Sequence, residues 1–264
     1  KSIFQKKSDF AQIIIDSIDA ADWLLTNGHL TTRSDSDVTL GTQLLNSSVE
    51  NAGSGLLTVS HAANIITDMY ATAGNLTIMQ QAAELNLDDL VVKAEKTVSV
   101  YTGTTVTTAA EANITVNKYA EFGAEATLNA NLTLATGSTL EVGAEGLNMG
   151  SSLTLNQGIT LGEDTLSRVR ALSVGQSATL FSGVDGLTLG NTSYTAITTD
   201  DYIMASPWFT NLSGDQYALT YTGMDNGSLN ITMMSAVPEP TSATLSLLAL
   251  AALAARRRRA AQAK

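Results

Sequence analysis

The sequence predicts an all-β protein whose main body is a right-handed parallel β-helix, with a cap at each end and a hydrophobic helix at the C-terminus. Three observations predict it: short alternating apolar and polar units in mid-chain, aromatic-rich alternation after them, and a final apolar run between prolines and arginines. They divide the chain into an N-terminal region at 1–72, β-helix repeats at 73–189, a C-terminal β cap at 190–236 and a C-terminal segment at 237–264.

The N-terminal region shows apolar residues at helical spacing. These residues are Phe10, Ile14, Ile18, Ala21 and Leu25. Ser8 is placed to cap such a helix and Gly28 to end it, which predicts a capping helix across the first coil of the solenoid. The β-branched run Ile13-Ile14-Ile15 serves a strand equally well, so a strand is the alternative here.

The repeat region is built from three-residue units in which a polar residue separates two apolar residues. The units are Leu76-Thr77-Ile78, Val98-Ser99-Val100, Ile114-Thr115-Val116, Leu132-Thr133-Leu134, Leu140-Glu141-Val142, Leu147-Asn148-Met149, Leu153-Thr154-Leu155 and Ile159-Thr160-Leu161. Alternation with period two indicates strands with one buried face, and strands this short suit a solenoid better than a sandwich. A β-sandwich with irregular loops is the alternative, because the spacing between units drifts from six to eight residues.

Corresponding positions recur at about the length of one solenoid coil. The separations are 18 residues from Ile114 to Leu132, 21 from Leu132 to Leu153 and 19 from Leu140 to Ile159. This recurrence predicts three strands per coil, with Leu132 stacked on Leu153 inside and Thr133 and Thr154 facing water.

The cap at 190–236 is predicted from its aromatic residues and from a hairpin pattern. Seven of the chain's fourteen aromatic residues lie between Phe181 and Tyr221. Alternating residues at 217–221 and 229–233 flank Asn226-Gly227, a dipeptide typical of tight hairpin turns. Trp208 and Phe209 are expected to pack in the cap, and a stacking surface for sugar rings is the alternative.

The C-terminal segment combines a stiff proline pair, an apolar helix and a basic end. Val237, Pro238, Glu239 and Pro240 form an extended stretch, because proline restricts its own backbone and that of the preceding residue. The helix has no polar face; its residues are Ala243, Leu245, Leu247, Leu248, Leu250, Leu253 and Ala255. Thirteen residues rise about 20 Å, a marginal span of a hydrocarbon core of roughly 30 Å. A buried helix of a soluble domain is the alternative, but it would need a polar stripe.

Four adjacent arginines, Arg256, Arg257, Arg258 and Arg259, end the segment and favour the cytoplasmic side of a membrane. The order of parts resembles the PEP-CTERM tail of exported Gram-negative proteins. This resemblance implies recognition of the proline segment by exosortase, a membrane transpeptidase, while the helix holds the chain transiently in the inner membrane. The repeats resemble, in composition only, the passenger repeats of autotransporter-type adhesins. A classical autotransporter would also need a C-terminal barrel.

Composition agrees with export. The chain has no cysteine and a net charge of −11, which argues against a thiolate metal site and against nucleic acid as a partner. Lys1 is preceded by no initiator methionine or apolar leader, which we interpret as a fragment or a processed form.

Residues that could carry chemistry are few. His29 and His61 have no ligand partner at metal-binding spacing, and we expect both in surface or loop positions. The carboxylate pairs are Asp88-Asp89, Glu163-Asp164 and Asp200-Asp201, and Asp35-Ser36-Asp37 resembles half of a calcium loop. Adjacent acids on a strand point to opposite faces, so the pairs indicate solvated charge. The basic residues of the coils are scattered: Lys93, Lys96, Lys118, Arg168 and Arg170.

We therefore predict no catalytic, metal or cofactor site and no enzyme. The expected function is an exported surface or extracellular-matrix structural protein, adhesin-like, first held in the inner membrane and then delivered to the cell surface. Its outward hydroxyl and amide groups suggest weak polar contacts with extracellular polysaccharide. The alternative is a fragment of a β-helix carbohydrate-active enzyme, of the polysaccharide lyase or glycosidase type.

Overall fold

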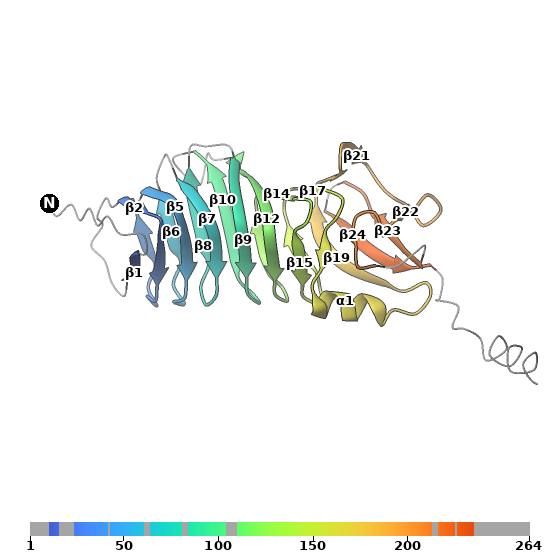
Figure 1. The fold of residues 1–264 in the computed structure, drawn as a ribbon, viewed down its shortest axis with the longest axis horizontal. Helices are drawn as coiled ribbons and strands as arrows, with labels where there is room; N and C mark the ends of the chain where they lie inside the picture. Colours follow the sequence, from blue (N-terminus) through green and yellow to red (C-terminus); the bar gives the residue numbers. More distant parts are fainter. Residues whose placement is uncertain are drawn as a thin grey trace, which may run out of the picture.

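The computed structural model describes residues 11–15, 24–41, 43–60, 64–80, 84–103, 110–212, 216–224 and 226–234. They form a β-solenoid of about six turns, in which two largely parallel sheets face each other across an apolar core. Figure 1 shows the coils stacked along the long axis and the cap closing the C-terminal end. The predicted solenoid is confirmed.

Sheet A runs the length of the solenoid. Its strands, in spatial order, are β1 (Ala11–Ile15), β3 (Gly28–Thr32), β5 (Gln43–Asn51), β7 (Ile65–Ala71), β9 (Glu84–Val92), β12 (Asn113–Phe122), β14 (Asn131–Leu134), β17 (Ser152–Leu155), β20 (Gly186–Leu189) and β21 (Thr192–Tyr194). Three further strands pair beside this path: β2 (Leu24–Thr26), β15 (Thr139–Val142) and β18 (Thr160–Leu161).

Sheet B forms the opposite wall and continues into the cap. Its strands, in spatial order, are β4 (Val38–Leu40), β6 (Leu57–Ser60), β8 (Leu76–Gln80), β10 (Thr97–Thr102), β13 (Thr127–Asn129), β16 (Leu147–Met149), β19 (Ser177–Val184), β24 (Gly227–Met233), β23 (Tyr217–Tyr221) and β22 (Ile203–Met204). β11 (Ala110–Glu111) pairs with β10.

The predicted stacking register is confirmed in the middle of sheet A. Ile114 pairs with Leu132, and Leu132 pairs with Leu153, all at most 1 % exposed. Thr133 and Thr154 lie between them on the outer, partly exposed side. One prediction is off by two residues: Leu140 stacks on Leu161, not on Ile159, which instead forms a bridge to Phe209 of the cap.

The number of strands per coil changes along the solenoid. Coils between residues 127 and 161 have the predicted three strands. From β5 to β12, one long sheet A strand in each coil (β5, β7, β9 or β12) continues around a corner and takes the place of two shorter strands. In β9 the corner lies between Leu87 and Leu90, which are both fully buried. The two residues between them therefore both face outward. Strict alternation fails wherever a strand turns such a corner.

The predicted N-terminal capping helix is wrong where the structure describes it. Residues 11–15 form β1, in which Ile13 pairs with Leu30 of β3. The β-branched run decided the outcome, since such residues favour a pleated strand; Ser8, Phe10, Ile18 and Ala21 lie outside the described residues. The solenoid also has no boundary at residue 73, because β7 pairs directly with β9 and β6 with β8.

The cap contains the predicted hairpin, and one helix that the residue pattern does not predict precedes it. β23 and β24 pair antiparallel from Tyr217↔Met233 to Tyr221↔Leu229. Asn226 has a φ of 66°, as expected, but the connection between the two strands spans 222–226 and is longer than a two-residue turn. Helix α1 (Glu163–Arg170) lies along one edge between β18 and β19 (Figure 1).

Within the described ranges, no helix is both long and apolar enough to cross a membrane. The helix predicted at 243–255 lies outside those ranges.

Candidate functional site

The outer face of sheet A collects most of the polar side chains that interact across coils. One outward row contains His29, Ser48, Asp68, Asp89, Tyr119, Thr139 and Thr160. The next outward row contains Thr31, Glu50, Tyr70, Val91, Glu121 and Glu141. Since parallel coils stack in register, residues about 20 positions apart become neighbours on this face.

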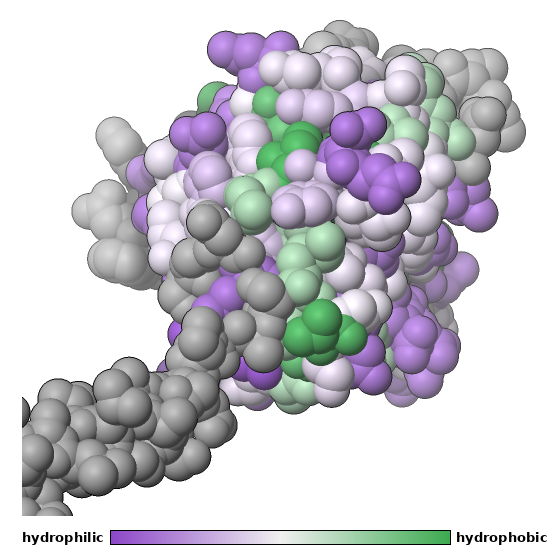
Figure 2. Space-filling view, turned by 90° about the vertical axis from the view of Figure 1, so that its right-hand side faces the viewer, coloured by the Kyte–Doolittle hydropathy of each residue, from purple (hydrophilic) through white to green (hydrophobic). Residues whose placement is uncertain are grey.

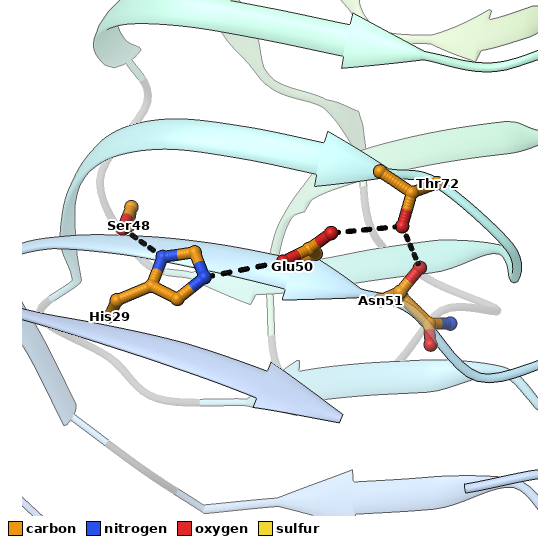
Figure 3. Close-up of polar contacts among 5 residues, drawn as sticks. All are labelled: His29, Ser48, Glu50, Asn51 and Thr72. Carbon is orange, nitrogen blue, oxygen red and sulfur yellow. Dashed lines mark hydrogen bonds and ion pairs between the residues drawn. The ribbon is translucent and has the colours of Figure 1, made fainter. Parts of the chain in front are cut away.

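A histidine network occupies the N-terminal part of this face (Figure 3). His29 Nδ1 lies 2.5 Å from Ser48 Oγ, and His29 Nε2 lies 3.3 Å from Glu50 Oε2. Thr72 Oγ1 lies 3.0 Å from both Glu50 Oε1 and the Asn51 carbonyl oxygen, and its one proton can serve either acceptor. Local spacing does not identify Glu50 as a partner of His29, because Glu50 lies one coil away in the sequence. His61 lies outside the described residues.

Ser48, His29 and Glu50 have the residue types of a hydrolytic triad, but their surroundings favour a structural role. Asp68 pairs with Ser48 on the adjacent strand, so a carboxylate stands beside the hydroxyl. Acyl transfer needs donors that stabilise a developing oxyanion, and a neighbouring carboxylate opposes that charge. The contacts of this network join three consecutive coils.

Carboxylates gather next to this network, at the corner of β9. The prediction that Asp88 and Asp89 point to opposite faces is wrong, because the corner turns both outward. Asp88 Oδ2 accepts a hydrogen bond from Lys118 Nζ at 2.7 Å, and Asp89 Oδ2 lies 3.4 Å from the Tyr70 hydroxyl. Asp68 pairs with Asp89 across the strands. Among the described residues, no group of three or more His, Cys, Asp or Glu residues is arranged to hold a metal ion.

The environment of this corner changes the pKa of two groups. Burial, followed by the nearby charges of Asp68 and Asp89, raises the pKa of Tyr70 to about 12 from its ordinary 10.0. Burial and the neighbouring Asp68 also raise the pKa of Asp89 above its usual value. Both shifts favour the protonated form.

The high pKa of Tyr70 predicts a change in stability at alkaline pH. Because the folded pKa is raised, the contribution of protonated Tyr70 is fully present below pH 10.0 and is lost as the pH rises through about 12. Tyr119 also has a pKa of about 12, raised by burial and then by Glu121. We expect Tyr70→Phe to lower the amplitude of the late tyrosinate titration by one tyrosine and to reduce the loss of stability over this window. Tyr119→Phe should lower the late amplitude by the same amount, and an unchanged late amplitude in the Tyr70→Phe protein would contradict the assignment.

The other residues singled out in the sequence have structural positions. Asp35 Oδ1 accepts from Ser54 Oγ at 2.8 Å and Asp37 Oδ1 from the Leu56 amide at 2.9 Å, so both tie one coil to the next. Trp208 and Phe209 are 7 % and 0 % exposed, which confirms the prediction that they pack in the cap.

The remaining charged residues lie on the surface or pair locally, except Arg168, whose Nε and Nη2 atoms are buried without a hydrogen-bond partner. Glu163-Asp164 begins α1, and Asp200-Asp201 is exposed in the cap. Lys93 pairs with Glu121 of a later coil. Val237–Pro240, the apolar residues from Ala243 to Ala255, and Arg256–Arg259 lie outside the described residues.

The fold defines the chain as a β-solenoid protein. Its last described residue is Met234, and the proline segment follows three residues later in the sequence. Comparison with protein-family models finds the PEP-CTERM protein-sorting motif at residues 236–259. The chain therefore carries a PEP-CTERM sorting signal on a β-solenoid, and PEP-CTERM proteins are exported and sorted to the cell surface by exosortase. Comparisons with curated proteins and with solved structures gave no match.

Proposed function

We propose that this protein is a non-enzymatic structural component of the cell surface or extracellular matrix, adhesin-like in role. The observation that supports this proposal most is the sorting motif, which begins at residue 236, two positions after Met234, the last described residue of the β-solenoid cap. The stacked coils give a rigid body, and the motif directs it out of the cell. A solenoid of this kind is suited to presenting a long surface.

In the proposed maturation, an exosortase-like membrane transpeptidase recognises Val237–Pro240. The apolar residues from Ala243 to Ala255 hold the precursor in the inner membrane, and Arg256–Arg259 stay on the cytoplasmic side. The solenoid would then be released or transferred as the mature surface protein.

Changing both Pro238 and Pro240 to alanine tests this maturation step. The substitution removes the backbone restriction of the recognised segment, and both positions come after Met234, the last residue that the structure describes. We expect the unprocessed form to accumulate in cells while thermal unfolding of the solenoid stays unchanged. Normal maturation of the double variant would contradict the proposal.

We also propose extracellular polysaccharide as the material that the mature surface contacts. Support comes from the outward rows of sheet A, in which most of the serine, threonine, tyrosine and carboxylate side chains are partly exposed. When one weak polar contact to a polymer has formed, the neighbouring contacts along the rod form at high effective concentration. The overall affinity then exceeds that of a single contact. We expect the purified protein to bind some polysaccharides on a glycan array, and binding no higher than background across the array would remove this part of the proposal.

A carbohydrate-active enzyme is the second candidate, and the carboxylates at the corner of β9 together with Ser48–His29–Glu50 are the observation that favours it. Two assays discriminate the candidates. Turnover of an acidic polysaccharide, or fluorophosphonate labelling that disappears in Ser48→Ala, would favour the enzyme; we expect neither.

A further inference from the structure

The chain is held in the cap up to the point where it leaves the described structure. β24 lies between β19 and β23, so it is an inner strand of sheet B. The Met233 amide donates to the Gln176 carbonyl at 3.0 Å, and the Met233 carbonyl accepts from Gly175 at 2.8 Å. The Met234 amide donates to the Gln216 carbonyl at 2.7 Å. Met234, two positions before the sorting motif, is therefore hydrogen-bonded to the body of the fold.

The tether from this place to the sorting motif is short. Pro238 follows Met234 by four residues, which reach at most about 14 Å when fully extended. That length is close to the diameter of a single α-helix with its side chains, about 10–12 Å. An enzyme that binds Val237–Pro240 therefore has to bring its own surface against the end of the cap.

The surface beside the exit carries an exposed apolar side chain on a rigid turn. After α1, the Leu172 amide donates to the Val169 carbonyl at 3.2 Å, and the Gln176 amide donates to the Ser173 carbonyl at 2.9 Å. Val174, at the tip of this turn, is 56 % exposed and directly precedes Gly175, which bonds to Met233. Figure 1 shows the segment after α1 running toward the place where the chain leaves, and Figure 2 shows apolar side chains among polar ones on this end of the molecule.

We infer that the exit rim, defined as the turn 172–176 with Gln216, Met233 and Met234, is a docking surface for the processing enzyme. The membrane transpeptidase covers Val174 with an apolar surface while it holds the proline segment, so the folded cap forms part of its substrate. This inference rests on the proposed function and adds a second recognised element to the sorting motif.

The test is Val174→Asp in the full chain, followed by pulse-chase measurement of processing in cells. A charge in place of a valine that becomes covered should slow processing roughly three- to tenfold. Ile65→Asp is the matched control, because Ile65 is 59 % exposed on β7, away from the exit. We expect this control to be processed at the wild-type rate. Both variants should unfold at the wild-type temperature, since both side chains are exposed.

Three outcomes decide the inference. Processing of Val174→Asp at the wild-type rate would overturn it, as would equal slowing of the Ile65→Asp control. Processing of the purified variants by detergent-solubilised membranes of the same cells separates the enzyme from the lipid surface. The slowing caused by Val174→Asp should persist there, and its disappearance without a bilayer would assign the contact to lipid instead. The Pro238/Pro240 double variant, run in parallel, reports on the sorting signal itself. If that variant is retained while Val174→Asp matures normally, only the docking surface fails.

Discussion

Phe122→Ala should lower the free energy of unfolding by about 3–5 kcal/mol. Phe122 is 1 % exposed and lies in one interior stack between Val92 of the preceding coil and Val142 of the next. Removing its ring leaves a cavity in the middle of the solenoid, where each coil is supported only by its two neighbours. Urea unfolding followed by circular dichroism measures the change.

Thr115→Ala is the matched control for this prediction. Thr115 lies on the same strand, β12, but faces outward. Its substitution should change stability by no more than about 0.5 kcal/mol. A loss below about 1 kcal/mol for Phe122→Ala would contradict the description of the interior as a closely packed stack.

Gly74→Ala should destabilise the protein by about 2–4 kcal/mol. A Cβ at Gly74 would lie 2.2 Å from the Gly53 carbonyl oxygen and 2.5 Å from Asn51 Nδ2. Asn51 is fully buried, and its amide donates to the carbonyls of Gly55 and Asn75, so it links the turns of two coils. Making room for the methyl group disturbs these bonds and leaves buried polar groups without partners.

Gly150→Ala provides the control for the glycine substitution, since a Cβ at Gly150 meets nothing within 4 Å. We expect its unfolding midpoint to stay close to wild type. Equal midpoints for the Gly74→Ala and Gly150→Ala proteins would show that the two turns are not in the close contact described.

The sequence predicted the parts of the fold that depend on local alternation. Ile114, Leu132 and Leu153 were identified as one stack because a period of two and a recurrence near 20 residues both apply there. The β23–β24 hairpin was found for the same reason, with Asn226 marking its turn. The predictions of the stack and of the hairpin are both correct because the strands concerned pair in a regular register.

Features that depend on contacts between coils could not be predicted in this way. Helix α1 has no side-chain cap of its own; Glu141, from the preceding coil, accepts the Thr165 amide at 2.6 Å. Asp88 and Asp89 both face outward because β9 turns a corner at these residues. The residue types around the corner do not indicate it. Likewise, His29 and Glu50 are 21 positions apart and meet only because one coil separates them. At the N-terminus, helical spacing and β-branching conflicted, and strand pairing with β3 decided the outcome.

The most direct test of the account is intact-mass spectrometry of the protein isolated from the cells that make it. The proposed maturation predicts a mature chain that ends at or near the proline segment and lacks the residues that follow it, recovered from the cell surface or medium. A chain that still carries Lys264 in the native surface material would contradict the claim that the sorting signal delivers this solenoid.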